Sequence, residues 1–322
     1  MSASTPGLHH VTAIARDPQR VAEFYVETLG LRFVKRTINH DDKHTYHLYF
    51  GDSEGTPGTN ITFFPWGERG RSGRFGDGQA RTTAYFVPEG SLDYWYDRLE
   101  AHNVSIEGPT ERFEETILTF DDPDGITLAL VATADAPSGQ PWDESPVPAE
   151  YQLRGFHSVT LAVSEIEPTA TVLTDGFGYE FVAKEDGRHR YRSATGGPGS
   201  IVDLVETDHG RGRIGVGTVH HVAYKAEDTD EQQRWRNQLN EYGLRVTDIV
   251  DRVYFKSIYF REPGGILFEI ATMGPGFTVD QTRDELGTNL VLPARLEGEH
   301  SEIESRLPPL ENPSTDHSSS EQ

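Results

Sequence analysis

Two histidine doublets and one glutamate carry the clearest chemical signal in this sequence. His9-His10 and His220-His221 each stand at an apolar, strand-like segment, and Glu269 lies inside a third such segment between apolar neighbours. A carboxylate in that setting is costly unless a positive group meets it. Side chains alternate across a strand, so the two histidines of a doublet point to opposite faces. Two imidazoles and one carboxylate suit a divalent iron with open coordination positions.

Four copies of one βαβββ pattern must position these residues. Each copy reads as an apolar strand, an amphipathic helix and three further strands. The copies occupy residues 7–66, 81–132, 155–206 and 218–273. The segment 133–150, rich in Pro, Ala, Asp and Glu, is interpreted as a linker between an N-terminal domain, 1–132, and a C-terminal domain, 151–273. The predicted fold class is therefore α+β, with two tandem domains and curved mixed sheets.

Local patterns give more detailed predictions within this frame. In the fourth module a strand is expected at 244–250, and Tyr242 is expected on the apolar helix face, as Tyr96 is in the second module. Residues 274–322 form a C-terminal tail with a short helix near 280–286, and its end, 313–322, is predicted to be disordered.

Alignment of the four modules indicates which histidines could share a metal. His10 falls against Ser158 in the third module, and His221 falls against Thr82 in the second. Only the first and fourth modules therefore carry imidazole at the inward position, and only the fourth adds a glutamate, Glu269. Pairing these two modules gives a ligand set of His10, His221 and Glu269. The single His157 matches His9 instead, and His47 is interpreted as structural.

With these residues in place, the sequence resembles the vicinal oxygen chelate superfamily, also called the glyoxalase/bleomycin resistance superfamily, and within it the ring-cleaving dioxygenases that act on hydroquinones. The resemblance extends from the segment GLHHVTAIA at 7–15 to the tail pattern between Asp280 and Pro293. It implies that the first and fourth modules share Fe(II), with Mn(II) as the alternative ion, on His10, His221 and Glu269. It also implies roles beside the metal for His9, Thr12, His220, Arg252 and Tyr259.

The expected activity is an extradiol-type dioxygenase reaction, in which O₂ is inserted into a hydroquinone or a related aromatic diol. Arg252 and His220 would stabilise developing negative charge, and Tyr259 would hydrogen-bond the substrate oxygen and help to transfer its proton. Three alternatives stay open: a glyoxalase-like isomerase or lyase, a catechol extradiol dioxygenase, and a small-molecule-binding protein without enzymatic activity. Thr62 at the fourth ligand position speaks against the first, and Ser158 against the second.

Composition limits the other partners. The 322 residues contain 52 acids and 29 bases, a formal net charge of −23, and only five lysines. Such a surface repels nucleic acid and anionic membranes, and its balance resembles that of proteins from halophilic organisms. The sequence has no cysteine and no apolar run of the roughly 20 residues that a membrane span needs. A cytoplasmic protein is expected, and association of identical chains is left open.

Overall fold

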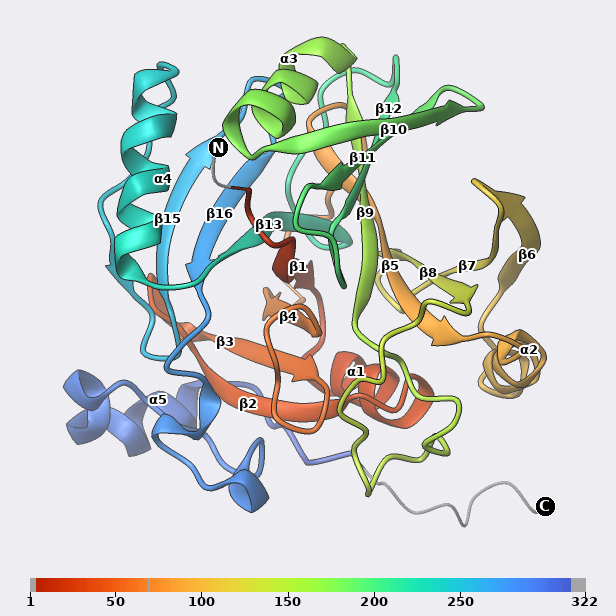
Figure 1. Cartoon of the computed structure of the whole chain (residues 1–322). Coiled ribbons are helices and arrows are strands. Elements are labelled where there is room, and N and C mark those ends of the chain that lie inside the picture. Colours follow the sequence, from red (N-terminus) through yellow and green to blue (C-terminus); the bar gives the residue numbers. More distant parts are fainter. Residues whose placement is uncertain (1–3, 69, 314–322) are drawn as a thin grey trace.

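The computed structural model describes residues 4–68 and 70–313, whose strands form two curved eight-stranded sheets (Figure 1). The first sheet has the order β14-β15-β16-β13-β1-β4-β3-β2, and the second has the order β10-β11-β12-β9-β5-β8-β7-β6. The strands of the first sheet are β1 (Leu8–Ala15), β2 (Arg32–Asn39), β3 (Asp42–Gly51), β4 (Asn60–Pro65), β13 (Thr218–Ala226), β14 (Val250–Asp251), β15 (Lys256–Arg261) and β16 (Leu267–Thr272). Those of the second are β5 (Gln79–Pro88), β6 (Ile106–Arg112), β7 (Glu115–Asp121), β8 (Thr127–Thr133), β9 (Phe156–Val163), β10 (Tyr179–Glu185), β11 (Arg188–Ser193) and β12 (Ile201–Glu206). The predicted α+β class with four βαβββ modules is confirmed.

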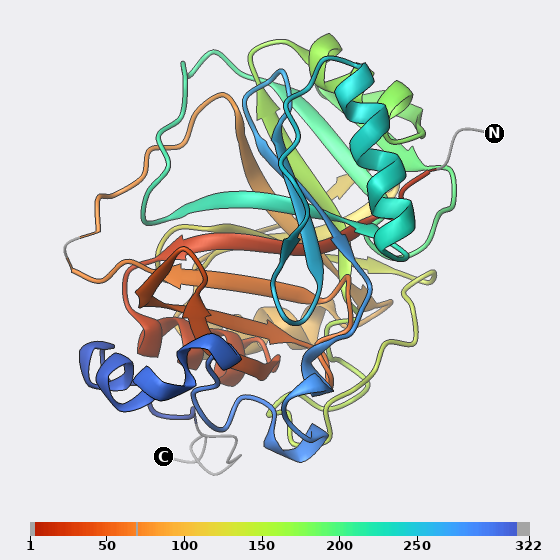
Figure 2. The same ribbon diagram turned by 90° about the vertical axis from the view of Figure 1, so that its left-hand side faces the viewer.

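Each sheet combines modules that are distant in the sequence. In the first sheet β1 pairs antiparallel with β13, so that the first module continues into the fourth. Figure 2 shows these two strands, red and teal, crossing the middle of the molecule side by side. In the second sheet β5 pairs antiparallel with β9, which joins the second module to the third. The domain boundary at 133–150 stays a prediction. It does not separate the two sheets, because each sheet contains strands from both sides of this boundary.

The helices pack their apolar faces against the outer faces of the sheets. They are α1 (Pro18–Glu23) with the π-helical turn η1 (Phe24–Thr28), α2 (Leu92–Ala101), α3 (Ile166–Thr171) with η2 (Val172–Gly176), and α4 (Thr229–Glu241). Asp17 caps α1 because its carboxylate accepts hydrogen bonds from two free amides of the first turn. Tyr25 then packs against Phe63 of β4, with ring centroids 4.8 Å apart, and Trp235 of α4 is fully buried.

Two predictions about helix faces are wrong. Tyr96 and Tyr242 are 42% and 55% exposed, although both were expected on apolar faces. Trp95 and Leu99 supply the buried face of α2, and Trp235 and Leu239 supply that of α4. Tyr96 directly follows Trp95, so it projects to the side of the stripe that Trp95 and Leu99 define. Tyr242 is in line with Trp235 and Leu239, but it is the C-cap residue of α4, and its hydroxyl donates to the Asp175 carbonyl at 3.0 Å.

The predicted strand at 244–250 is also largely wrong, because regular pairing is confined to β14, Val250–Asp251. Thr247 explains the interruption. Its carbonyl accepts a hydrogen bond from Arg236 Nε at 2.8 Å, and its hydroxyl, rather than its carbonyl, accepts the Tyr259 amide at 3.0 Å. One backbone bond to β15 remains, from the Thr247 amide to the Tyr259 carbonyl at 3.0 Å. The side-chain bonds take the place of the reciprocal backbone bond, so the ladder does not continue.

The tail covers the first module's outer strands. It contains the short helices η3 (Phe277–Val279), η4 (Arg283–Glu285), η5 (Ala294–Glu299) and α5 (His300–Arg306). Lys35 of β2 is buried and donates to Asp280 at 2.7 Å, which ties the tail to the first sheet. Residues 314–322, most of the segment predicted to be disordered, lie outside the described residues. Across 4–68 and 70–313, no helix has the length and apolarity that crossing a bilayer requires.

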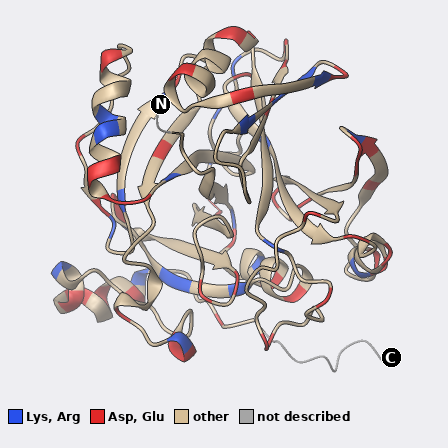
Figure 3. Ribbon diagram, viewed as in Figure 1, with Lys and Arg blue, Asp and Glu red and all other residues tan. Residues whose placement is uncertain are grey.

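The charge distribution predicts a salt-dependent stability. Asp and Glu occur on helices, strand ends and loops throughout the ribbon (Figure 3), and the net charge of −23 makes the folded chain repel itself. Since the screening length shrinks from about 30 Å at 0.01 M salt to about 3 Å at 1 M, the melting temperature should rise with added NaCl. Thermal melts across that series provide the measurement, and an unchanged melting temperature would contradict the prediction.

Candidate metal centre

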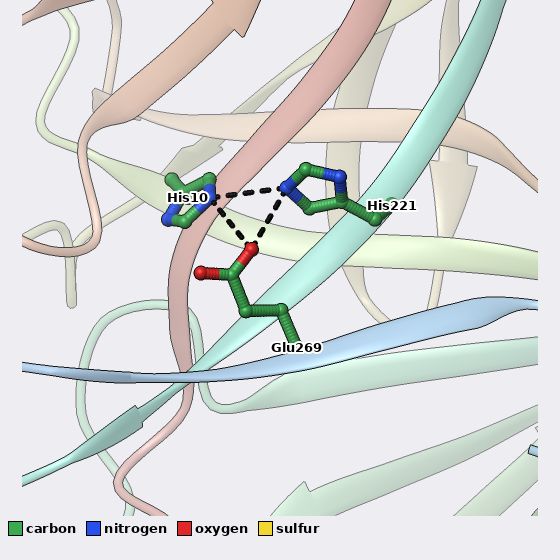
Figure 4. Close-up of side chains that lie close together, drawn as sticks. All are labelled: His10, His221 and Glu269. Atoms are coloured by element: carbon green, nitrogen blue, oxygen red, sulfur yellow. Dashed lines mark hydrogen bonds and ion pairs between the residues drawn. The ribbon is translucent and has the colours of Figure 1, made fainter. Parts of the chain in front are cut away.

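His10, His221 and Glu269 meet at one point on the inner face of the first sheet (Figure 4). Glu269 Oε2 lies 2.9 Å from His221 Nε2 and 3.4 Å from His10 Nε2, and the two imidazole nitrogens are 3.2 Å apart. All three side chains are buried, with Glu269 completely inaccessible. Within the described part of the chain, this is the one group of three His, Cys, Asp or Glu side chains spaced to hold a metal.

Strand register explains why these residues converge. In β13, His221 and Ala223 are two positions apart and therefore share a face. Ala223 lies opposite His10 of β1 on one side and opposite Glu269 of β16 on the other. All four side chains consequently point to the same face, and the small Ala223 leaves room between its two larger neighbours. Nothing in the residue pattern of the sequence predicts that Ala223 is the spacer between His10 and Glu269.

The hydrogen bonds behind His10 orient its lone pair toward the site. His9 Nε2 lies 3.1 Å from the Thr272 carbonyl and must donate to it, since a carbonyl only accepts. Burial lowers the pKa of His9 well below its ordinary value, so the neutral ring accepts at Nδ1 from His10 Nδ1 at 2.9 Å. His10 Nε2, the ring nitrogen not used in this contact, faces the Glu269 carboxylate. The second doublet repeats this contact, with the two Nδ1 atoms of His220 and His221 2.8 Å apart.

The residues present fit a divalent metal ion. Glu269 Oε2 is buried, and no hydrogen bond of acceptable geometry reaches it within the described residues, whereas Oε1 accepts from Ser257 Oγ at 2.5 Å. Burial alone would raise the pKa of Glu269, but His10 and His221 hold it well below its ordinary value. Burial also lowers the pKa of His221. A carboxylate oxygen and two imidazole nitrogens facing one point form a donor set suited to a divalent metal ion.

A cavity of about 370 Å³ opens over these ligands. Its apolar wall consists of aromatic and aliphatic side chains: Tyr49, Phe64, Trp66, Phe255 and Leu267. Such a space, with a flat aromatic wall beside convergent polar side chains, is typical of a pocket for a small planar ligand.

Arg252 and Tyr259, predicted to face the cavity, both line it. Arg252 Nε donates to the Tyr259 hydroxyl at 3.1 Å, and Arg252 Nη2 lies 3.3 Å from Asp41 of the β2–β3 hairpin. Tyr259 lies opposite Glu269 in the strand register, and its ring contacts that of His221 edge to face at 5.9 Å. Burial and the nearby Glu269 raise the pKa of Tyr259, so its hydroxyl stays protonated at neutral pH.

The remaining predicted residues divide into two groups. His220 lines the cavity, and burial lowers its pKa to about 3, so its ring is neutral. His9 and Thr12 lie behind the ligands. Thr62 occupies the position of a possible fourth ligand. Its hydroxyl is hydrogen-bonded to the Thr12 hydroxyl, with the two Oγ1 atoms 2.8 Å apart.

His47 lines the cavity, although it was expected to be a structural residue. Its Nε2 contacts Thr62 Oγ1 at 2.9 Å, and its Nδ1 accepts or donates a hydrogen bond with the Tyr49 hydroxyl at 2.8 Å. Burial lowers the pKa of His47 well below its ordinary value. The alternation of His47 and Tyr49 on β3 is the signal that could have placed both residues on the inner face.

The half-buried His40 at the cavity rim predicts a pH-dependent stability. Burial, with Arg252 and Arg295 nearby, lowers its folded-state pKa to about 4, against about 6.5 in an unfolded chain. Between these values the unfolded state binds a proton that the native state does not, so stability falls as pH falls through this window. His40→Asn should therefore reduce the pH slope by up to about one proton.

Urea unfolding of metal-free protein between pH 4.5 and 7 measures this slope. His209→Asn, at an exposed position, is the matched control for the loss of one imidazole. Equal slopes for the His40 variant and the unsubstituted protein would show that His40 does not titrate in this way.

The fold and the site together define a class of protein. The chain belongs to the Glyoxalase/Bleomycin resistance protein/Dioxygenase superfamily, whose model matches residues 7–130 and 155–270. Among its relatives is the "Putative ring-cleaving dioxygenase MhqO" of Bacillus subtilis (strain 168), 45% identical over 311 residues that cover 97% of this chain and 98% of the relative.

Two further relatives extend this comparison. The "Chlorohydroquinone/hydroquinone 1,2-dioxygenase" of Sphingobium indicum is 35% identical over 305 residues, covering 92% of this chain and 94% of that protein. A crystal structure described as a "putative dioxygenase" from Bacillus subtilis superposes with a TM-score of 0.92 at 44% identity, covering 96% of this chain and 99% of that one. The resemblance found in the sequence is thereby confirmed.

Proposed function

We propose that this protein is an Fe(II)-dependent, extradiol-type ring-cleaving dioxygenase that acts on a hydroquinone or a related aromatic diol. The observation that carries the proposal is the buried cluster of His10, His221 and Glu269 at the floor of an aromatic-walled cavity. Two relatives support it, because one is named as a putative ring-cleaving dioxygenase and the other as a chlorohydroquinone/hydroquinone 1,2-dioxygenase. Mn(II) is the alternative ion for the same donor set.

His10 Nε2, His221 Nε2 and Glu269 Oε2 would hold the metal. When bound, the ion would supply the Lewis-acid and electron-transfer chemistry that the reaction between a diol and O₂ needs. The chain's own contribution at this point is orientation. His9 and His220 hold the two ligand rings through Nδ1 contacts of 2.9 and 2.8 Å, and such outer contacts commonly decide metal affinity and ligand basicity.

The cavity wall would bind and orient the ring. Phe64, Phe255 and Leu267 offer flat apolar contact beside the ligands, so an aromatic diol can be desolvated on its carbon face while its oxygens reach the polar floor. Binding two reactants side by side removes much of the entropic cost of bringing them together.

Tyr259 and Arg252 would manage the proton and the charge. Since Arg252 Nε donates to the Tyr259 oxygen, the hydroxyl proton of Tyr259 is free to face the substrate oxygen. The raised pKa of Tyr259 keeps that proton in place, and the fixed guanidinium stabilises negative charge that develops there. Neutral His220, at the other side of the cavity, offers a second donor.

The reaction balances without another reductant. One ring carbon–carbon bond beside a hydroxyl-bearing carbon breaks, and each resulting end receives one atom of O₂. For unsubstituted hydroquinone the hydroxyl-bearing carbon becomes a carboxylic acid and its neighbour becomes an aldehyde, so the product is the sum of diol and O₂.

A substrate panel tests this proposal against its alternatives. Oxygen uptake by iron-loaded protein should be fast with hydroquinones and slow with catechol. The hemithioacetal of methylglyoxal and glutathione should not be isomerised, because Thr62 replaces the second carboxylate of a glyoxalase-type ligand set. Turnover of the hemithioacetal without oxygen uptake on any diol would overturn the dioxygenase proposal.

A further inference from the structure

The inner face of the second sheet carries arginines where the first sheet carries its metal ligands. Thr82 and Ser158 occupy the positions that align with His221 and His10. Beside them Asp203 is buried and receives two hydrogen bonds from Arg190, at 2.9 Å from Nε and 3.1 Å from Nη2. This face is therefore polar and charged, but its carboxylate is occupied by a guanidinium.

A second carboxylate completes the pairing of Arg190. Glu115 of β7 accepts from Arg190 Nη1 at 2.6 Å and lies 2.9 Å from His157 Nε2. Although burial opposes it, these two partners lower the pKa of Glu115, so this carboxylate is charged. Arg190, Asp203 and Glu115 thus satisfy one another.

Arg188 adds positive charge that this pairing does not neutralise. It lies at the start of β11, where Nη1 donates to Thr160 Oγ1 at 2.6 Å and is 3.5 Å from the already paired Asp203. Burial lowers its pKa to about 10, and three further arginines, Arg112, Arg190 and Arg81, act in the same direction. These arginines are therefore near enough to Arg188 for their charges to repel its own.

Arg81 and Arg112 contribute charge without an acidic partner. Within residues 4–68 and 70–313, neither forms an ion pair with a carboxylate; Arg81 stacks on Phe75 with a separation of 5.5 Å. Arg188 and Arg190 thus share two carboxylates, Asp203 and Glu115, and Arg81 and Arg112 pair with neither, in a chain whose overall net charge is −23. Arg81 is exposed and Arg112 is half-buried, so both guanidinium groups are open to an anion from solvent. Repulsion between like charges held near one another is relieved when a counter-ion joins them.

Three of these four arginines line a cavity of about 860 Å³ between the second sheet and the first module. Arg81, Arg112 and Arg188 lie along it, together with Arg20 of α1. Its acids are Glu107, Asp121 and Asp122, of which Asp121 accepts from Thr127 at 2.8 Å and Asp122 from Tyr25 at 3.2 Å. The space is large enough for a small organic acid.

We propose that the second sheet carries a binding site for a small oxyanion, a carboxylate or a phosphate, held by Arg81, Arg112 and Arg188. The planar guanidinium fork matches both kinds of anion through paired N–H···O bonds. The site is separate from the metal cluster and does not depend on the proposed dioxygenase activity.

Isothermal titration of the full-length protein with succinate and with inorganic phosphate tests this site. Ionic strength is held constant with NaCl, so that general screening does not differ between runs. The expected result is about one oxyanion bound per chain, and the anion that binds identifies the source class. Arg112→Gln and Arg81→Gln should each weaken binding about tenfold or more, as expected for loss of a hydrogen bond to a charged group.

Two controls make the result specific. Arg234→Gln removes one exposed positive charge on α4 and should bind as the unsubstituted protein does. His10→Ala should also bind normally, which separates this site from the metal cluster. Absence of binding for both anions, or equal affinity in the Arg112, Arg81 and Arg234 variants, would overturn the proposal.

Discussion

His10→Ala is expected to abolish iron binding, whereas the unsubstituted protein, purified anaerobically and loaded with Fe(II), should retain about one iron per chain. The reason is geometric. His10 Nε2 is one of three ligand atoms that face a single point. The hydrogen bond between the Nδ1 atoms of His10 and His9 fixes the orientation of the His10 ring. With only His221 and Glu269 left, the site loses a nitrogen ligand and gains open space. Metal analysis after gel filtration provides the measurement.

His157→Ala is the matched control for this experiment. His157 is also a buried strand histidine next to the start of its module, but it contacts Glu115 and Ser158 in the second sheet. Its loss leaves Glu115 bonded to Arg190, so the fold and the iron content should be largely retained. Iron loss in the His157 variant, together with normal iron in the His10 variant, would show that the wrong modules had been paired.

Tyr259→Phe should retain iron yet slow turnover by roughly 10²–10⁴-fold, the range typical of a lost proton-transfer group. The hydroxyl is the one atom removed, and it accepts from Arg252 rather than binding the metal. The ring that packs against His221 remains. Oxygen consumption at saturating hydroquinone, normalised to iron content, measures the effect.

Arg252→Ala tests the same contact from the other side. It should also retain iron and lose rate, because the Tyr259 hydroxyl then loses its donor and the cavity loses its guanidinium charge. Arg252→Lys keeps the charge but not the fork, and it should recover part of the rate. Normal turnover in both Tyr259→Phe and Arg252→Ala would remove these residues from the mechanism and leave the metal ligands alone.

The buried cluster of candidate metal ligands could be predicted from the sequence because two simple periodicities determine it. Alternation along a strand distinguishes His10 from His9, and the module repeat distinguishes His10 from Ser158. Glu269 is conspicuous because an unpaired carboxylate in an apolar strand is costly. These are local signals, and the register through Ala223 then converts them into one site.

Features that depend on tertiary contacts could not be predicted in the same way. The strand expected at 244–250 is interrupted because Arg236, on a helix, occupies the Thr247 carbonyl. Alternation along β3 could have placed His47 on the inner face, but not its contact with Thr62 on the neighbouring β4. Neither partner is visible in a pattern of residue types, since each lies on a different element.

The arginines of the second sheet illustrate the same limit. Arg81, Arg112 and Arg188 come from three strands, β5, β6 and β11, and each read alone is an ordinary strand arginine. Their significance follows only from the sheet order, which brings the second and third modules together. The duplication predicted from the sequence therefore indicates where to look, while the chemistry of the second face depends on the assembled fold.

Turnover of hydroquinone under ¹⁸O₂ by the iron-loaded protein tests the central claim most directly. Oxygen uptake should equal diol consumption, and mass spectrometry should find both labelled atoms in the ring-opened product, one in the new carboxylate and one in the aldehyde before it exchanges with water. Oxidation of hydroquinone to benzoquinone with no label in the organic product, and with release of hydrogen peroxide, would contradict ring cleavage by this protein.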